Sequence, residues 1–115
     1  MSLPEGEIEI SPEQAQAAVD AGEAQLVDVR EGYEWEAGRI EGARHVELQE
    51  LASQAATLDR DRPVIFQCRS GARSLMAAQA FRQAGYQAYS MAGGLQQWAG
   101  EGRPMQPEGA RVAEH

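Results

Sequence analysis

The polar and apolar positions of this chain predict an alternation of short buried strands and helices. Strands are predicted where apolar, β-branched or aromatic residues run together or alternate with polar ones. These segments are residues 7–10, 25–30, 43–46, 64–67 and 87–91. Helices are predicted where apolar residues recur at helical spacing or where a capping or chain-breaking signal precedes the segment. These segments are residues 12–21, 47–58, 73–84 and 95–99, with 31–38 forming a turn or a short helix. In the helix over 73–84, the residues available for the core are Leu75, Met76, Ala80 and Phe81.

Strands that alternate with helices are typical of an α/β domain, so we expect a mainly parallel sheet with helices on both faces. In such a sheet, ligands bind at the carboxyl ends of the strands. Arg30 and Cys68 both lie at predicted strand ends. We expect one domain over residues 6–104 and a flexible tail over residues 105–115, where proline and glycine break the pattern.

The most informative stretch is residues 64–76, where a predicted strand ends at Cys68 and a helix follows almost at once. Cys68 is the only cysteine, and the residues after it are Arg-Ser-Gly-Ala-Arg. A lone cysteine is often an inert buried residue. Here, however, loop and helix N–H groups can point at the sulfur, and Arg69 and Arg73 can stabilise a thiolate or hold an anion. We therefore expect a reactive thiol, in a loop where Gly71 permits an unusual backbone turn.

The spacing of this loop bears on the group that it holds. Cysteine phosphatases place five residues between the cysteine and the arginine, and their ring of backbone amides accommodates phosphate. Here only four residues separate Cys68 from Arg73. A tighter loop favours a smaller group, such as a single sulfur atom bound to Cys68, over a phosphate.

Composition and charge disfavour several classes of function. The formal net charge of −8 argues against nucleic acid and anionic membrane surfaces as partners, because both attract positive charge. No apolar run approaches the length of a membrane span, and no secretory signal is evident. A single cysteine fits a reducing compartment, so we expect a cytoplasmic protein. One cysteine with two distant histidines predicts no metal site, and there is no glycine-rich nucleotide motif, so we expect no cofactor.

Four segments together resemble the single-domain rhodaneses, a thiosulfate sulfurtransferase-like family. The segments are Leu26-Val27-Asp28-Val29-Arg30-Glu31, Gly38-Arg39-Ile40-Glu41-Gly42-Ala43, the loop from Cys68 to Ser74, and Gly93-Gly94 with Trp98. The resemblance covers residues 8–104 and implies a rhodanese-like α/β fold, with a central parallel five-stranded sheet and helices on both faces. It also implies that residues 68–73 form the active-site loop, which is one residue longer in phosphatase-like and arsenate-reductase-like relatives. Arg39 and Glu41 stand where the family often has His and Pro, which leaves the shape and charge of the pocket rim open.

The mechanism that follows is sulfur transfer. Cys68 attacks the outer sulfur of thiosulfate or a similar donor, releases sulfite and carries a persulfide, from which cyanide or a thiol takes the sulfur. Cys68 is the expected catalytic residue. The expected substrate-binding loop is Arg69, Ser70, Gly71, Ala72 and Arg73, with support from Asp28, Arg30 and Ser74. Both loop arginines are candidates for binding the sulfonate of the donor, although Arg73 has the alternative of tying the loop to Glu31 or Asp28.

Two other functions stay open. The same loop suits a persulfide carrier, or sulfur-relay module, that works with a protein partner. A cysteine phosphatase or an arsenate reductase is a third interpretation, which the short loop disfavours. Among the remaining residues, His45 and Trp98 are expected to be structural, and Trp35 to pack or to line the pocket mouth. The acidic residues of segment 31–36 are expected to form a solvated face.

Overall fold

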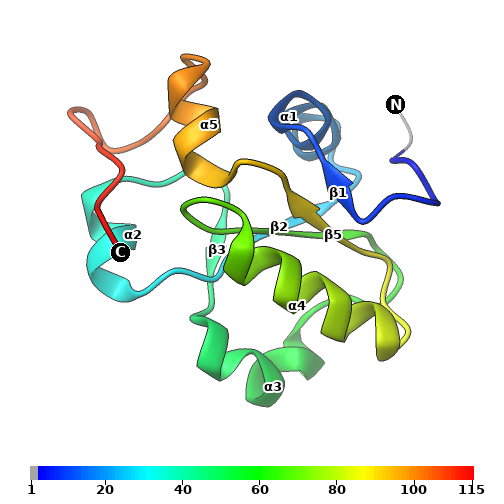
Figure 1. The fold of residues 1–115 in the computed structure, drawn as a ribbon. Coiled ribbons are helices and arrows are strands. Elements are labelled where there is room, and N and C mark those ends of the chain that lie inside the picture. The colour runs from blue at the N-terminus through cyan, green and yellow to red at the C-terminus, as the bar shows by residue number, and fades with distance from the viewer. Residues whose placement is uncertain (1–2) are drawn as a thin grey trace.

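The structure, a computed structural model, describes residues 3–115 and contains a five-stranded sheet whose strand pairings are all parallel (Figure 1). The strands lie in the order β1-β5-β4-β2-β3, with β4 at the centre. Their bounds are β1 Glu9–Ile10, β2 Gln25–Asp28, β3 Arg44–His45, β4 Val64–Gln67 and β5 Ala88–Met91. The predicted α/β fold with a central parallel five-stranded sheet is therefore confirmed.

Helices cover both faces of this sheet. The helices are α1 Pro12–Asp20, α2 Gly32–Ala37, α3 Leu51–Gln54, α4 Ala72–Gln83 and α5 Gly94–Gly100, with two 3₁₀ helices, η1 Leu48–Glu50 and η2 Ala55–Thr57. One cluster of buried residues joins one face of the sheet to α3 and α4, and a second joins the other face to α1 and α5. Phe66 and Cys68 belong to the first cluster and Ile65 to the second, as the alternation of a strand requires. Cys68 therefore lies on the α4 side of the sheet.

Helix α1 begins with a capping box, in agreement with the use of a capping signal to predict a helix over residues 12–21. The Ser11 hydroxyl oxygen accepts a hydrogen bond from the Gln14 N–H (3.1 Å), and Gln14 Oε1 accepts one from the Ser11 N–H (2.9 Å). Each side chain thus satisfies a backbone donor that the first helical turn leaves free.

The segment over residues 47–58 is not the single helix that its apolar spacing predicts. It consists of η1, α3 and η2 in succession. The Ser53 hydroxyl donates to the Glu50 carbonyl (3.0 Å), and the Thr57 hydroxyl donates to the Gln54 carbonyl (2.6 Å). Such local side-chain bonds compete with the regular helical pattern, which explains why the segment breaks into short pieces.

Helix α4 turns a different face to the core than the sequence predicts. Its buried residues are Ser74, Ala77, Ala78 and Phe81. This spacing describes one helical stripe, and Met76 lies off it, with 60% of its surface exposed. The prediction that Met76 and Ala80 belong to the core is therefore wrong, because both are exposed, whereas Phe81 is buried as expected and packs against Phe66.

The C-terminal segment lies beside α2 (red in Figure 1). The Arg111 N–H donates to the Ala37 carbonyl (2.9 Å), residues 39 and 106 form an antiparallel bridge, and Ala113 is buried. The flexibility of residues 105–115 stays a prediction, but these contacts place the segment next to the helix that carries Glu34. No helix within residues 3–115 has the length and the apolar character needed to cross a membrane.

Candidate active site

The loop that follows β4 lies at the carboxyl end of the sheet, where the sequence predicts a site. Gln67, the last residue of β4, pairs in register with Asp28, the last residue of β2. Cys68 follows directly, and the loop ends at Gly71, which caps α4. The φ of Gly71 is 109°, in the left-handed region that favours glycine. Figure 1 shows this loop between the starts of α4 and α5.

The Cys68 sulfur is held by groups of the loop and of the first turn of α4. Sγ accepts hydrogen bonds from the N–H groups of Gly71 (3.1 Å) and Ser74 (3.4 Å). It also lies 3.5 Å from the Ser74 hydroxyl, which in turn bonds to the Ser90 hydroxyl at 2.7 Å. Cys68 is only 1% exposed, so water competes little with these donors. Two N–H groups directed at one sulfur stabilise a sulfur anion there.

Helix α5 holds the start of the loop. The N–H groups of Leu95 and Gln96 donate to the carbonyls of Cys68 (2.8 Å) and Arg69 (3.0 Å). The two backbones approach so closely that a Cβ on Gly94 would lie 2.5 Å from the Cys68 carbonyl oxygen. The glycine pair noted in the sequence thus has a physical role, because Gly94 lets α5 reach the loop.

Arg73 ties the other end of the loop to α2. Its Nη1 and Nη2 donate to the two carboxylate oxygens of Glu34, at 2.8 and 2.9 Å, and the Glu34 side chain has no exposed surface. Burial raises the pKa of the Glu34 carboxyl, but hydrogen bonds from Arg73 and from the Glu31 backbone outweigh burial and hold this pKa below its ordinary value. The bond to Glu34 also raises the pKa of the Arg73 guanidinium. Both groups are therefore ionised, and their pair braces the loop.

The partner of Arg73 differs from the two that the sequence suggests. Arg73 binds Glu34, rather than Glu31 or Asp28. The prediction of a solvated face over residues 31–36 is wrong for Glu34, although Glu31 is exposed. A local signal for Glu34 exists, because its carboxylate accepts from the backbone N–H three residues earlier (3.0 Å), as in a capping box.

Arg69 is the loop cation that the structure leaves available. Within residues 3–115 its guanidinium makes no hydrogen bond or ion pair, and its Nε is buried without a partner. Ser70 and Ala72, two other predicted loop residues, are exposed. Arg73 directs Nη1 and Nη2 at Glu34, whereas the Arg69 guanidinium has no such partner, so Arg69 is the loop arginine that no carboxylate holds.

Asp28 and Arg30 pair with each other at the carboxyl end of β2. Arg30 Nε and Nη2 donate to the Asp28 carboxylate at 2.9 and 2.8 Å, and neither side chain is exposed. Arg30 Nη2 also donates to the Gly38 carbonyl (2.7 Å), and the Arg30 carbonyl lies 2.7 Å from His45 Nε2. The His45 ring stacks on Trp35 with centroids 4.8 Å apart. These contacts connect β2 with β3 and with the end of α2, and the supporting role of Asp28 and Arg30 stays a prediction.

The sequence interpretation missed Ser90 entirely. Ser90 lies in β5 opposite Phe66 of β4, and its buried hydroxyl bonds to that of Ser74. A signal was present, since Ser90 is a small hydroxyl residue in a strand that is buried throughout. A buried hydroxyl normally has a hydrogen-bond partner, which points to a polar group nearby.

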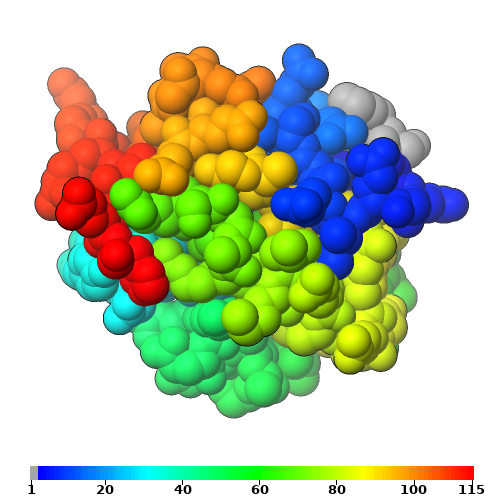
Figure 2. All heavy atoms as spheres, in the orientation of Figure 1, coloured from blue at the N-terminus to red at the C-terminus, as the bar shows by residue number. Residues whose placement is uncertain are grey.

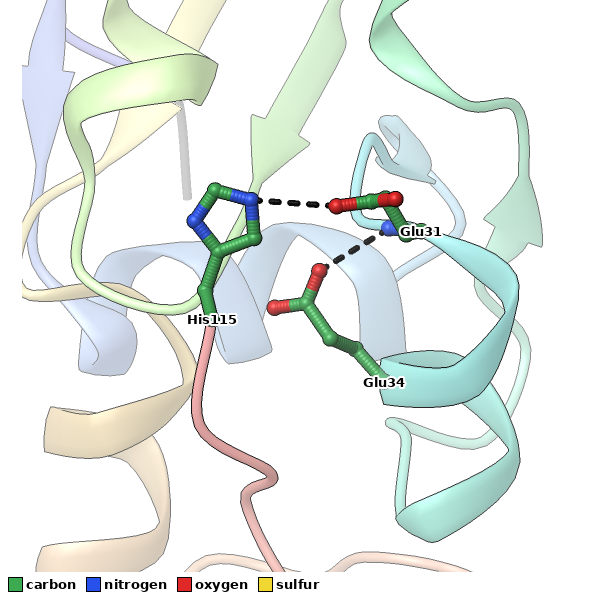
Figure 3. A group of neighbouring side chains, drawn as sticks. All are labelled: Glu31, Glu34 and His115. Atoms are coloured by element: carbon green, nitrogen blue, oxygen red, sulfur yellow. Dashed lines mark hydrogen bonds and ion pairs between the residues drawn. The ribbon is translucent and has the colours of Figure 1, made fainter.

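Glu31, Glu34 and His115 form a group whose ligand atoms lie within 4.8 Å of one another. Figure 3 shows His115, from the C-terminal segment, facing Glu31 with Glu34 beside it. His115 Nε2 lies 3.1 Å from a Glu31 carboxylate oxygen. Both Glu34 oxygens already accept hydrogen bonds from Arg73, whose charge repels a cation. We therefore assign no metal to this group.

Comparison with known proteins gives a family match over most of the chain. The family model described as "Rhodanese-like domain" matches residues 11–101. The chain is 34% identical over 97 residues to the putative sulfurtransferase YtwF of Bacillus subtilis. This match covers 84% of this chain and 94% of that protein. It is 38% identical over 90 residues to the thiosulfate sulfurtransferase GlpE of Pseudomonas aeruginosa, covering 77% and 81%. The chain is also 40% identical over 79 residues to the uncharacterized protein YqhL of Bacillus subtilis. This match covers 68% of this chain and 63% of that protein.

Solved structures agree with this match. A rhodanese-related protein from Thermoplasma volcanium superposes with a TM-score of 0.79 at 28% identity, covering 85% of this chain and 96% of that chain. A thiosulfate sulfurtransferase from Pseudomonas aeruginosa superposes with a TM-score of 0.79 at 27% identity. It covers 92% of this chain but 21% of that longer chain.

The Arg73–Glu34 pair predicts a pH-dependent effect on stability. Glu34→Gln should lower the free energy of unfolding near neutral pH by about 1–3 kcal/mol, because Arg73 loses its ionised partner. Glu36→Gln, an exposed position of the same helix, should change it by less than about 0.5 kcal/mol. The folded-state pKa of Glu34 lies below the unfolded-state value. Its stabilisation is therefore complete above the unfolded-state pKa and is lost as the pH falls through the folded-state pKa.

Denaturant unfolding at a series of pH values checks this. The difference in the free energy of unfolding between the wild type and Glu34→Gln should be constant from neutral pH to about pH 5. It should shrink below about pH 4. A difference that stays constant at acid pH would contradict the assignment.

The approach of α5 to the loop predicts unequal effects for two glycines of one helix. Gly94→Ala should lower the free energy of unfolding by about 2 kcal/mol or more, because its Cβ overlaps the Cys68 backbone and its φ is 57°. Gly100→Ala meets nothing within 4 Å and should be neutral or slightly stabilising. Urea unfolding of both variants checks this, and equal effects would show that α5 does not hold the loop.

Proposed function

Because this chain belongs to the rhodanese-like domain family, we propose that it is a sulfurtransferase that moves a sulfane sulfur from thiosulfate or a similar donor to a thiophilic acceptor through a persulfide on Cys68. The observation that carries the proposal is the pair of N–H groups, from Gly71 and Ser74, directed at Cys68 Sγ. The names of two relatives, a thiosulfate sulfurtransferase and a putative sulfurtransferase, support the same activity.

The first step loads sulfur onto the protein. The Cys68 thiolate attacks the outer sulfur of thiosulfate, the S–S bond of the donor breaks, and sulfite leaves with the bonding electron pair. The reactants are a thiolate and the anion thiosulfate, and the products are a persulfide anion and the anion sulfite. The total charge is unchanged, so no proton is transferred and no general base is required. The product persulfide carries its negative charge on the outer sulfur. Preorganised N–H groups of the loop stabilise this charge without rearrangement.

The two loop arginines have different roles in this proposal. Arg69 has free donors, and its planar guanidinium suits the oxygens of a sulfonate. Arg73 is held by Glu34 and keeps the loop in shape. Since the chain carries a net charge of −8, a local cation also offsets the repulsion that a dianionic donor meets as it approaches.

The second step unloads the sulfur. Cyanide or a thiolate attacks the outer sulfur, the bond to Cys68 Sγ breaks, and Cys68 returns to the thiolate. The four residues between Cys68 and Arg73 favour this sulfur chemistry over phosphate binding, because the loop is tighter than that of cysteine phosphatases. We expect the protein to act in the cytoplasm, where a reducing environment keeps a single thiol free.

The test is the mass of the intact protein after incubation with thiosulfate. We expect a gain of one sulfur atom, reversed by cyanide with formation of thiocyanate, and no gain in Cys68→Ala. A parallel incubation with 3-mercaptopyruvate compares a second class of donor. Absence of any gain with both donors, or a gain that survives Cys68→Ala, would contradict the proposal.

A further inference from the structure

Two buried hydroxyl groups, those of Ser74 and Ser90, form a chain that ends at the Cys68 sulfur. The two hydroxyl oxygens lie 2.7 Å apart, and the Ser74 oxygen lies 3.5 Å from Sγ. Neither serine has exposed surface. Figure 2 shows that α4 covers the sheet on this face of the molecule, so the chain lies between the helix and the sheet. Hydrogen bonds are stronger in such a buried place than in water.

The backbone of β5 fixes the position of Ser90. Ser90 lies opposite Phe66 of β4 and opposite Glu9 of β1, and its N–H donates to the Ile8 carbonyl (2.8 Å). Residues that pair in register share a face of the sheet, so the Ser90 side chain points to the α4 side, as that of Phe66 does. The Ser90 hydroxyl is therefore held by the sheet while it bonds to Ser74 of the helix.

The direction of the bond between the two hydroxyls follows from a count of donors and acceptors. Each serine hydroxyl has one proton and two acceptor positions. Within residues 3–115 the Ser90 hydroxyl bonds to Ser74 and to no other group. Ser74 has two further acceptors within reach, the Gly71 carbonyl at 3.2 Å and Cys68 Sγ. If Ser74 donated to Ser90, the Ser90 proton would be buried without a partner, which is costly. Ser90 therefore donates to Ser74.

This direction leaves the Ser74 proton for the loop. While Cys68 is a thiol, its S–H donates to the Ser74 oxygen, and the Ser74 proton goes to the Gly71 carbonyl. Once Cys68 is ionised, its sulfur is the stronger acceptor, so the Ser74 hydroxyl turns its proton to Sγ. The Gly71 carbonyl keeps the Leu75 N–H as a donor (3.0 Å). Both hydroxyls keep their protons throughout, and neither is left unpaired in either state.

We infer that Ser90 is a positioning residue, which keeps the Ser74 hydroxyl a donor and thereby stabilises the Cys68 thiolate through Ser74. The inference deepens the proposed function and rests on it for the use of the thiolate. In the proposed transfer, Cys68 is the nucleophile of the first step and the leaving group of the second, and it is a thiolate in both roles. A hydroxyl that accepts a hydrogen bond also donates a stronger one, by about 10–30%.

The test is a pH titration of the full chain, followed by the ultraviolet absorbance of the thiolate. Cys68 is the only cysteine, and Cys68→Ala supplies the blank for the tyrosines. We expect Ser74→Ala to raise the pH of half-maximal thiolate absorbance by about one unit, because the sulfur anion loses a charge-assisted donor. Ser90→Ala should raise it by about 0.3 units, because the Ser74 donor becomes weaker.

A double variant shows whether Ser90 acts through Ser74. When Ser74→Ala is already present, Ser90→Ala should cause no further shift of the titration. In the single variant Ser90→Ala, the thiolate fraction below the half-maximal pH is about twofold lower, so sulfur loading from thiosulfate there should slow by the same factor.

Tyr89→Phe is the matched control. It removes a hydroxyl from the neighbouring position of β5, whose side chain lies on the other face of the sheet, and should leave the titration unchanged. The charged side chains at this edge of the sheet are kept in every variant, so they do not cause a difference between variants. They are Arg69 of the loop, Arg73 of α4, Glu34 of α2, and Asp28 and Arg30 at the end of β2.

Three results would overturn the inference. A downward shift in Ser90→Ala would show that Ser74 donates to Ser90, so that loss of Ser90 frees the Ser74 proton for the sulfur. An unchanged titration in Ser90→Ala, or an equal shift with and without Ser74, would show that Ser90 has no effect through Ser74. Failure of the proposed function is seen separately, because the absorbance of the thiolate needs no sulfur donor, whereas loading from thiosulfate would be absent in the wild type as well.

Discussion

The ion pair between Arg73 and Glu34 is the interaction on which the shape of this site depends. It joins the first turn of α4 to α2 across 39 positions of sequence, and its carboxylate has no exposed surface. A buried carboxylate without a partner would be strongly destabilising, and its charge would also repel a sulfur anion in the adjacent loop. Arg73 cancels both effects. The groups that donate to the Cys68 sulfur are then the N–H groups of Gly71 and Ser74.

This arrangement explains why the loop can be rigid at both ends. Hydrogen bonds from α5 hold the carbonyls of Cys68 and Arg69, while Arg73 holds the other end. Between these anchors Gly71 supplies the one left-handed turn that directs its N–H at Sγ. In the proposed sulfur transfer, a site that is already in shape would need no rearrangement as charge moves from the donor to Cys68 and on to the acceptor. The contacts that stabilise the fold of the loop are therefore the same contacts that set the shape of the site.

Local rules of sequence were sufficient for much of this fold. The strand Val64–Gln67, the loop at Cys68 and the capping box at Ser11 all follow from residues that are neighbours in the chain. Parallel topology follows in turn from the alternation of strands and helices. The position of Cys68 at the carboxyl edge of the sheet was therefore predictable.

Contacts between segments that are distant in the chain were harder to predict from the sequence. Glu34 stands among acidic residues that look solvent-exposed, and only the three-dimensional approach of α2 to α4 gives it a partner. Ser90 acquires its role from strand pairing, which brings β5 beside β4. Met76 was misplaced because α4 has apolar residues on more than one side, so periodicity alone does not select the stripe that faces the core.

The division of roles between the two loop arginines can be measured in the loading step alone. A single-turnover rate of sulfur uptake is recorded against thiosulfate concentration for the wild type, Arg69→Ala and Arg73→Lys. If Arg69 binds the donor, Arg69→Ala should raise the half-saturating thiosulfate concentration about tenfold or more, with the free energy of unfolding almost unchanged. Arg73→Lys should lower the free energy of unfolding instead, since a lysine cannot reproduce the two-point contact with Glu34. An unchanged concentration dependence in Arg69→Ala would contradict this account of the site.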